Sequence, residues 1–312
     1  MNRTRLTGPG YPVRLYRRFS TPPPAPGLEH PGDHGLTPRP FRVRTADRVG
    51  ISGWSFVPDR PWGVVILCHA RNAGKSRVLR QAALLHGRQL TVVAFDFRGC
   101  GDSEAPRGRG RSLRAPLADL EAVARHVERE HAHDALLRHR IALMGCSFGG
   151  NMAIAHAGTA DRHYPAVILD STPLVRWQDM LRTLLREERR GSRAPRLRAA
   201  VDHAVIRAVV ARTRAGALYR QARRSTRRLG GTDLLLIAGD RDTFFDVEES
   251  CRFLDRHHTG RGEVWRVPRG RHLTNHLVDP ERYADRIVSF LRTAFTGSGP
   301  SERRTVPWQE PR

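Results

Sequence analysis

The sequence predicts an α/β fold with a mainly parallel, doubly wound sheet and a helical cap insertion. Short apolar runs alternate with segments whose apolar residues have helical spacing, a pattern typical of parallel strands joined by helices. One of these junctions, residues 145–149, is a cluster of small residues around a serine, as in a sharp turn between a strand and a helix. A single long segment, residues 171–230, has helical spacing without any strand-like run. We interpret this segment as an insertion between two strand–helix units.

The expected elements follow one another in order from Phe41. Strand-like alternation over residues 41–47 and 49–58 is interrupted by a turn, which predicts an antiparallel pair. The later runs are apolar throughout, as expected for strands that are covered on both faces. Strands are expected at residues 63–68, 90–96, in the first part of 139–156, and at 166–170, 233–239 and 262–267. Helices are expected around residues 78–85 and 113–131, in the second part of 139–156, and at 283–295.

The 312-residue chain is long enough for one large α/β domain, and a second independent domain is not required. We expect residues 1–40, which are rich in proline and poor in apolar anchors, to form a poorly ordered arm. The domain is then expected over residues 41–296, with 171–230 as its cap and 297–312 as a disordered tail. The sequence has no transmembrane run and no hydrophobic signal core, so the expected compartment is the cytoplasm.

The formal charge of +23 suggests an acidic partner such as nucleic acid, an anionic membrane surface or an anionic substrate. Lys75 is the only lysine, so 53 of the 54 basic residues are arginine, a bias more typical of genome-wide codon composition than of a phosphate-binding face. No aromatic residues alternate with the arginines as base-stacking platforms would. The composition therefore argues against nucleic acid as the main partner. Segment 171–230 nevertheless holds 16 arginines against 4 acidic residues, a net charge of +12.

The four cysteines show no C-x-x-C spacing, and they lie in or beside the expected core elements. We therefore expect reduced thiols, with neither a zinc site nor a disulfide framework. These residues are Cys68, Cys100, Cys146 and Cys251.

The stretch 139–156 predicts a strand, a sharp turn and a helix. In that turn Gly145, Ser147 and Gly149 fit the pattern G-x-S-x-G, in which a serine occupies a strained backbone conformation and the glycines let neighbouring backbone pass. Cys146 is a rival nucleophile, but a turn centred on it would put large side chains at the positions that must be small. We therefore expect Ser147 to be the nucleophile.

A serine hydroxyl is a weak nucleophile near neutral pH and needs a base, which in turn is oriented by an acid. Asp242 follows the strand expected at 233–239, and His272 follows the strand expected at 262–267. Loops at the carboxyl ends of neighbouring parallel strands can bring both side chains to Ser147. The alternative base is His276, and the alternative acids are Asp240, Asp246 and Asp170.

The chain order serine, acid, histidine resembles that of the α/β-hydrolase family. Residues 96–103, Asp-Phe-Arg-Gly-Cys-Gly-Asp-Ser, resemble the turn D-x-R-G-x-G-x-S that this family has after the strand preceding the serine turn. The chain from about Phe41 to Phe295 is therefore similar to serine hydrolases of the α/β-hydrolase type, which include esterases, thioesterases and S9-type peptidases. The resemblance favours Asp242 as the acid, because it matches the family spacing G-x-x-D.

The resemblance also implies an oxyanion hole made of two backbone N–H groups. One belongs to the residue after the nucleophile, Phe148, and the other to the loop 68–75. The family usually has His-Gly in that loop, whereas this chain has His69-Ala70, so Arg71 is the candidate for the second donor. The remaining polar residues of the two early loops are expected to organise the turns: His69, Asp96 and Ser103.

The loop that carries His272 departs from the family pattern G-x-G-H, because Arg269 and Arg271 flank the histidine. These two cations either lower the pKa of His272, bind an anionic group of the substrate or point into solvent.

The resemblance implies a two-step acyl transfer in which an ester or thioester is hydrolysed through an acyl-enzyme, with no metal or organic cofactor. The expected partner is a small-molecule or carrier-linked acyl substrate, and the arginines of the cap suggest that it is anionic. The same catalytic groups also serve acyltransferases and peptidases. The substitutions around His69 and His272 leave a further alternative, a non-catalytic binding protein on a hydrolase fold.

Overall fold

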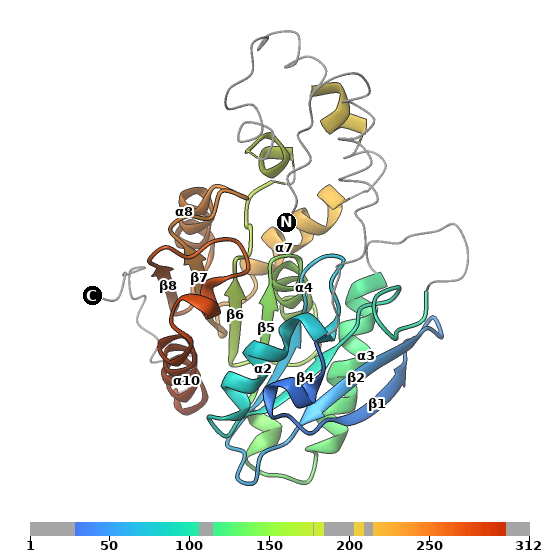
Figure 1. Ribbon diagram of the computed structural model, residues 1–312. Coiled ribbons are helices and arrows are strands. Elements are labelled where there is room, and N and C mark those ends of the chain that lie inside the picture. The colour runs from blue at the N-terminus through green and yellow to red at the C-terminus, as the bar shows by residue number, and fades with distance from the viewer. Residues whose placement is uncertain (1–28, 106–114, 177, 184–202, 209–214, 298–312) are drawn as a thin grey trace.

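The computed structural model describes residues 29–105, 115–176, 178–183, 203–208 and 215–297 (Figure 1). Its centre is an eight-stranded sheet with the order β1-β2-β4-β3-β5-β6-β7-β8. Strand β2 is antiparallel to both β1 and β4, and the remaining neighbours are parallel. The strands are β1 (Arg39–Arg44), β2 (Gly50–Phe56), β3 (Val64–Cys68), β4 (Thr91–Phe95), β5 (Ile141–Cys146), β6 (Ala166–Asp170), β7 (Asp233–Gly239) and β8 (Gly262–Val267).

Helices cover both faces of this sheet, because side chains alternate along each strand and the central strands are apolar on both sides. On β3, for example, Ile66 packs into the core on one face and Leu67 into the core on the other. The first face is covered by α3 (Ala115–Glu130), α4 (Phe148–Ala157), α7 (Ala215–Thr226) and α8 (Val247–His257). The second is covered by α2 (Leu79–His86) and α10 (Pro280–Thr296). The short helices are η1 (Pro31–His34), η2 (Lys75–Val78), η3 (Leu137–His139) and α9 (Asn275–Val278).

The predicted fold class, a mainly parallel doubly wound sheet, is confirmed by this arrangement. Each expected strand is present within three residues of its predicted bounds. Residues 1–28 of the predicted arm and 298–312 of the predicted tail lie outside the described residues. The last residues of the arm form η1 and the start of β1, which begins at Arg39.

The predicted cap, residues 171–230, is described only in part. Residues 178–183 and 203–208 are helical, and α7 forms its last helix. Helix α7 lies beside α4, where Leu218 and Ala222 enter the core that covers the sheet. The end of the segment is therefore part of the helical layer on the sheet, and the extent of the cap stays a prediction.

The strand order creates a crevice at the carboxyl edge of the sheet. Strand β4 pairs with β3 on one side. After β4 the chain crosses over β3, and β5 pairs with β3 on the other side. Loops that leave β3 and β5 diverge at such a point, and ligands of open α/β sheets bind there. Among the described residues, no helix combines the length and the apolar character needed to cross a membrane.

The only lysine of the chain is buried at this edge. The Lys75 ammonium lies 2.5 Å from Asp96 Oδ2 and 2.6 Å from Asp102 Oδ2, and 4.5 Å from the centre of the Trp54 ring. Asp96 also accepts hydrogen bonds from the backbone N–H groups of Lys75 and Asp102. These contacts tie the loop after β3 to the loop after β4.

Helix α4 carries a buried histidine whose protonation destabilises the fold. His156 is 3% exposed, and its Nε2 lies 2.9 Å from the hydroxyl of Tyr164. Burial lowers the pKa of His156 from 6.5 to about 4, although the nearby carboxylate of Glu121 opposes this shift. Between pH 6.5 and pH 4, His156 is protonated in the unfolded chain but neutral in the folded chain. The free energy of unfolding therefore falls as the pH drops from 6.5 towards 4, by up to about 3 kcal/mol for this group.

Replacement of this histidine is expected to flatten the pH dependence of stability. The variant His156→Gln keeps a polar group for Tyr164 but cannot gain the proton, so it should lose less stability than the wild type between pH 6.5 and pH 4. Urea unfolding at a series of pH values measures the difference. The exposed His133, replaced by glutamine, is the control and should keep the wild-type slope. Equal slopes for His156→Gln and the wild type would contradict this assignment.

Candidate active site

The turn between β5 and α4 holds Ser147 in a strained backbone conformation, with φ 52° and ψ −111°. A Cβ atom on Gly145 would lie 2.3 Å from the backbone carbon of Gly149, and one on Gly149 would lie 2.3 Å from the carbonyl oxygen of Cys68. Both contacts are too short for any side chain, so the two glycines allow the turn to close. The backbone N–H of Ser147 donates to the carbonyl oxygen of Asp170, at 2.8 Å, which fixes the turn against β6.

Three predicted side chains meet at this turn. His272, on the loop after β8, has its Nε2 3.1 Å from Ser147 Oγ and its Nδ1 2.8 Å from Asp242 Oδ2. Asp242 follows β7, and its buried carboxylate also accepts the backbone N–H of Phe244, at 2.9 Å. A neutral imidazole that donates from Nδ1 to Asp242 leaves Nε2 free to accept the proton of the Ser147 hydroxyl. The geometry thus suits proton transfer from the serine.

Two phenylalanines that were not predicted from the sequence hold the imidazole. The ring of Phe244 stacks on His272, with 4.2 Å between ring centres and 16° between planes. Phe245 meets the same imidazole edge-on, with 6.1 Å between centres. The loop after β7 therefore provides both the carboxylate and the apolar walls that orient the histidine. The sequence signal was the pair of adjacent aromatic residues in a loop where polar turn residues are usual.

Asp170, one of the alternative acids, binds other groups. It is fully buried at the end of β6, and its Oδ1 accepts from the side-chain amide of Asn275, at 2.7 Å. Its Oδ2 accepts from the Tyr283 hydroxyl, at 2.7 Å, and the Ser171 hydroxyl lies 3.0 Å from Oδ1. Burial and the neighbouring Asp170 carboxylate raise the pKa of Tyr283, so the phenol stays a donor.

These contacts anchor the loop that carries the histidine. The Ser171 hydroxyl oxygen accepts the backbone N–H of Leu273, at 3.0 Å, directly after His272. Leu273 itself has φ 62°, a conformation that a leucine adopts only when its surroundings impose it. Asp170 and Ser171 therefore position the loop of His272. Asn275 and Tyr283 were not predicted in this network from the sequence, because they lie more than 100 residues from Asp170.

The other candidate residues from the sequence, all within the described ranges, form no hydrogen bond with Ser147. They are the alternative base His276 and the alternative acids Asp240 and Asp246. His276 is buried, and its Nδ1 lies 3.1 Å from the side-chain amide of Gln81. Asp246 caps α8 by accepting the backbone N–H of Glu249, and Asp240 is exposed to solvent. The structure thus favours Asp242 and His272 as the partners of the serine.

The thiol next to the serine is not poised for attack. Cys146 is 2% exposed, and burial raises its pKa well above the ordinary value of a thiol. A neutral buried thiol is a poor nucleophile. All four cysteines are unpaired, so no disulfide constrains the chain.

The two candidate oxyanion donors lie at one cavity. Arg71 and Phe148 both line a hollow of about 160 Å³ at the carboxyl edge, together with Phe97 and Tyr219. The first turn of α4 presses against the end of β3, which brings the loop after β3 beside the serine turn. The backbone N–H groups of Phe148 and Arg71 stay the predicted donors.

His69 links the loops that border this cavity. Its Nδ1 donates to the carbonyl oxygen of Ala70, at 2.7 Å, and its Nε2 accepts the backbone N–H of Phe97, at 3.0 Å. Burial lowers the pKa of His69, so the ring is neutral and both nitrogens are used. Ser103 acts similarly in the next loop, because its hydroxyl donates to the carbonyl oxygen of Asp96.

Arg269 and Arg271, which flank His272 in the sequence, are both exposed to solvent. Of the three interpretations of these cations, the structure favours side chains that point into solvent. Within the described part of the chain, no cluster of three or more histidine, cysteine or acidic side chains is suited to a metal ion.

Comparison with known proteins agrees with this architecture. A family model described as serine aminopeptidase, S33, matches residues 59–203. The structure of the Pyrococcus furiosus esterase Pf2001 covers 86% of this chain and 96% of its own, with a TM-score of 0.66 and 21% identity. The chain has the α/β-hydrolase fold, and it resembles this family in sequence over residues 59–203. An esterase from Exiguobacterium antarcticum shares this fold, with a TM-score of 0.59 and 16% identity over 81% of this chain and 99% of the other.

The curated relatives of this chain match over shorter stretches. An uncharacterised abhydrolase domain-containing protein of Dictyostelium discoideum is 27% identical over 142 residues, which is 45% of this chain and 14% of that protein. An uncharacterised protein of Mycobacterium tuberculosis is 30% identical over 135 residues, 42% of this chain and 44% of that protein. The chain thus matches less than half the length of these relatives.

Because backbone atoms at the end of β3 lie so close to Gly149, a single methyl group at this position is expected to destabilise the fold strongly. Gly149→Ala forces a Cβ atom into the backbone at the end of β3, so we expect a loss of at least about 3 kcal/mol in the free energy of unfolding. Gly32→Ala is the control, because Gly32 lies in a short helix and a Cβ atom added there would have no neighbour within 4 Å. Chemical denaturation compares the two. Similar stabilities would show that the turn does not need glycine.

Proposed function

We propose that this protein is a serine hydrolase that cleaves an ester or thioester through a covalent acyl-enzyme. The observation that carries the proposal is the chain of contacts from Ser147 Oγ to His272 Nε2 and from His272 Nδ1 to Asp242, at 3.1 Å and 2.8 Å. Serine, histidine and acid in this geometry activate a hydroxyl for attack on a carbonyl. The esterases among the similar structures share the fold on which the site is built.

In the proposed reaction Ser147 Oγ attacks the carbonyl carbon while His272 Nε2 takes the hydroxyl proton. The Asp242 carboxylate stabilises the imidazolium through the Nδ1–H, and the stacked Phe244 keeps the ring in plane. The backbone N–H groups of Phe148 and Arg71 donate to the oxyanion of the tetrahedral intermediate. His272 then returns the proton to the leaving oxygen or sulfur. In the second half a water molecule, deprotonated by His272, releases the acid and restores Ser147.

The charge around the cavity argues against aminopeptidase activity, which the description of the family model raises as a second candidate. An aminopeptidase binds a free α-ammonium group, which a nearby carboxylate would stabilise. The described residues that line the cavity beside Phe148 include Arg71 but no carboxylate. Arg98 also lines it, and its guanidinium pairs with Asp47 and Asp119. The same catalytic groups could pass the acyl group to an acceptor other than water. A small acyl substrate and a cytoplasmic location stay predictions.

The serine and its neighbouring thiol give matched tests of the nucleophile. Ser147→Ala is expected to lower kcat for 4-nitrophenyl butyrate by at least about 10³-fold, because no other group can form the acyl-enzyme. Cys146→Ala, at the adjacent buried position, should keep kcat within about threefold of the wild type. Steady-state hydrolysis assays on both variants decide between the two nucleophiles. Loss of activity in Cys146→Ala alone would overturn the proposal.

The acid is tested by two aspartates of the same loop. Asp242→Asn should lower kcat by about 10²- to 10⁴-fold, because an amide favours the wrong histidine tautomer and cannot stabilise the imidazolium. Asp240→Asn removes the same charge two residues away, from an exposed side chain, and should leave kcat nearly unchanged. Equal losses in the two variants would show that only the net charge of the loop matters.

A further inference from the structure

Helix α7 has two chemically distinct faces. Leu218, Ala222 and Ser225 are buried and pack towards α4. The other face carries arginines three or four residues apart, a spacing that places them on one side of a helix. These arginines are Arg220, Arg223, Arg224 and, just after the helix, Arg227.

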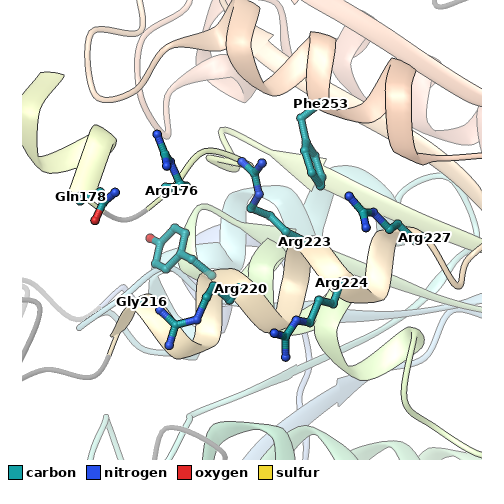
Figure 2. Close-up of a pocket in the computed structure, with 9 residues that line it drawn as sticks. Arg176, Gln178, Gly216, Arg220, Arg223, Arg224, Arg227 and Phe253 are labelled. Carbon is teal, nitrogen blue, oxygen red and sulfur yellow. The ribbon is translucent and has the colours of Figure 1, made fainter.

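The arginine face borders a concave pocket of about 420 Å³, which we call the arginine pocket (Figure 2). Arg176, which follows β6, and Phe253 on α8 complete its walls. In Figure 2, Arg223 on α7 and Arg227 just after it extend towards Phe253, whereas Arg224 points away from it. A volume of this size suits a small-molecule group better than an extended polymer.

The positive charge of the pocket is compensated only in part. Arg176 pairs with Asp179, at 2.7 Å. Within the described ranges, no carboxylate forms an ion pair with any of the four arginines on or just after α7. Glu249 and Asp179 act on Arg223 electrostatically without forming an ion pair with it. The pocket thus concentrates like charge that an anion would neutralise.

Arg223 is held in place for such a contact. One of its guanidinium nitrogens donates to the carbonyl oxygen of Leu174, at 3.0 Å, and the group lies 4.1 Å from the centre of the Phe253 ring. Burial lowers the pKa of Arg223, and the neighbouring Arg176 and Arg227 act in the same direction. A half-buried, oriented guanidinium is the kind of donor that binds phosphate or carboxylate in a bidentate manner.

The arginine pocket is adjacent to the candidate active site. Tyr219 lines both this pocket and the smaller cavity that holds Phe148 and Arg71. The two hollows therefore share a wall. A molecule that spans this wall would bring its anionic group to the arginines and its other end to the cavity at Phe148, the residue after Ser147.

We propose that the arginine pocket binds a phosphate-bearing group of the ester substrate, with Arg223 and Arg227 as its principal donors. The inference rests on the proposed hydrolase function, which supplies the ester. A phosphate is favoured over a single carboxylate because the guanidinium groups of Arg223 and Arg227 extend to the same side of the pocket without an ion-pair partner among the described residues, and a phosphate presents more charge and more acceptor oxygens to them.

Binding is tested with inorganic pyrophosphate, titrated calorimetrically into the full chain at constant ionic strength. Arg227→Gln and Arg223→Gln are each expected to weaken binding by about fivefold or more. Arg228→Gln is the matched control, because Arg228 is exposed beside Arg227 but does not line the pocket, and it should change the affinity by less than about twofold. Arg227 is exposed, so its replacement tests the site even where Arg223→Gln fails to fold.

The inference would be overturned if pyrophosphate did not bind, or if all three variants lost the same affinity for it. Either result would indicate diffuse attraction by a basic surface. Citrate, titrated in the same way, should bind at least about fivefold more weakly than pyrophosphate, and equal affinity would contradict the phosphate assignment. A short single-stranded RNA that binds more tightly than pyrophosphate, and is weakened equally by the three substitutions, would assign the charge to nucleic acid instead.

A kinetic comparison links the pocket to catalysis. The butyryl ester of glycerol 3-phosphate should have a KM at least about fivefold below that of the butyryl ester of glycerol, and Arg227→Gln should abolish this difference with little change in kcat. Pyrophosphate binding without hydrolysis of either ester would contradict the proposed function. Hydrolysis of both esters with equal KM, and without pyrophosphate binding, would overturn this inference and leave the hydrolase intact.

Discussion

The site depends on one constraint, the close packing of the turn between β5 and α4 against the end of β3. Backbone atoms approach where Gly145 and Gly149 have no side chain, and this approach holds Ser147 at φ 52°. The hydrogen bond from its N–H to the carbonyl oxygen of Asp170 adds a tie to β6. Because the neighbouring parallel strands β5, β6, β7 and β8 end at the same edge, the loops after β7 and β8 can reach the same hydroxyl with a carboxylate and an imidazole. The contacts of the turn with β3 and β6 thus hold the serine in its strained backbone conformation.

Buried polar groups fix the loops around this turn. The Lys75 ammonium between two carboxylates joins the loops after β3 and β4, and the Asp170 network holds the loop of His272. Such groups are costly to bury unless every partner is present, so their positions are well defined once the fold has formed. The site is therefore rigid on the sheet side. On the other side, the described part of the segment between β6 and β7 contributes Leu218 and Tyr219 of α7, the helix that carries the arginines.

The sequence predicted the sheet, its strands and the three side chains that the structure brings together, because each signal was local. A G-x-S-x-G pattern marks its own turn, Asp242 and His272 lie a few residues after apolar strand-like runs, and the family spacing G-x-x-D favours Asp242 over the other acids. Contacts between distant segments gave no such signal. The stacking of Phe244 on the imidazole, the bond from Tyr283 to Asp170 and the packing of α7 on α4 depend on how elements meet in space. Periodicity shows that a helix has an apolar face, but not what covers it.

The measurement that tests the activated serine most directly is labelling of the purified protein with a fluorophosphonate, followed by mass spectrometry of its peptides. This reagent reacts with a serine only when a neighbouring base activates the hydroxyl. We predict one adduct, on Ser147, that is absent from Ser147→Ala. A protein that stays unlabelled, or an adduct on another residue, would contradict an activated Ser147 and favour a binding protein on a hydrolase fold.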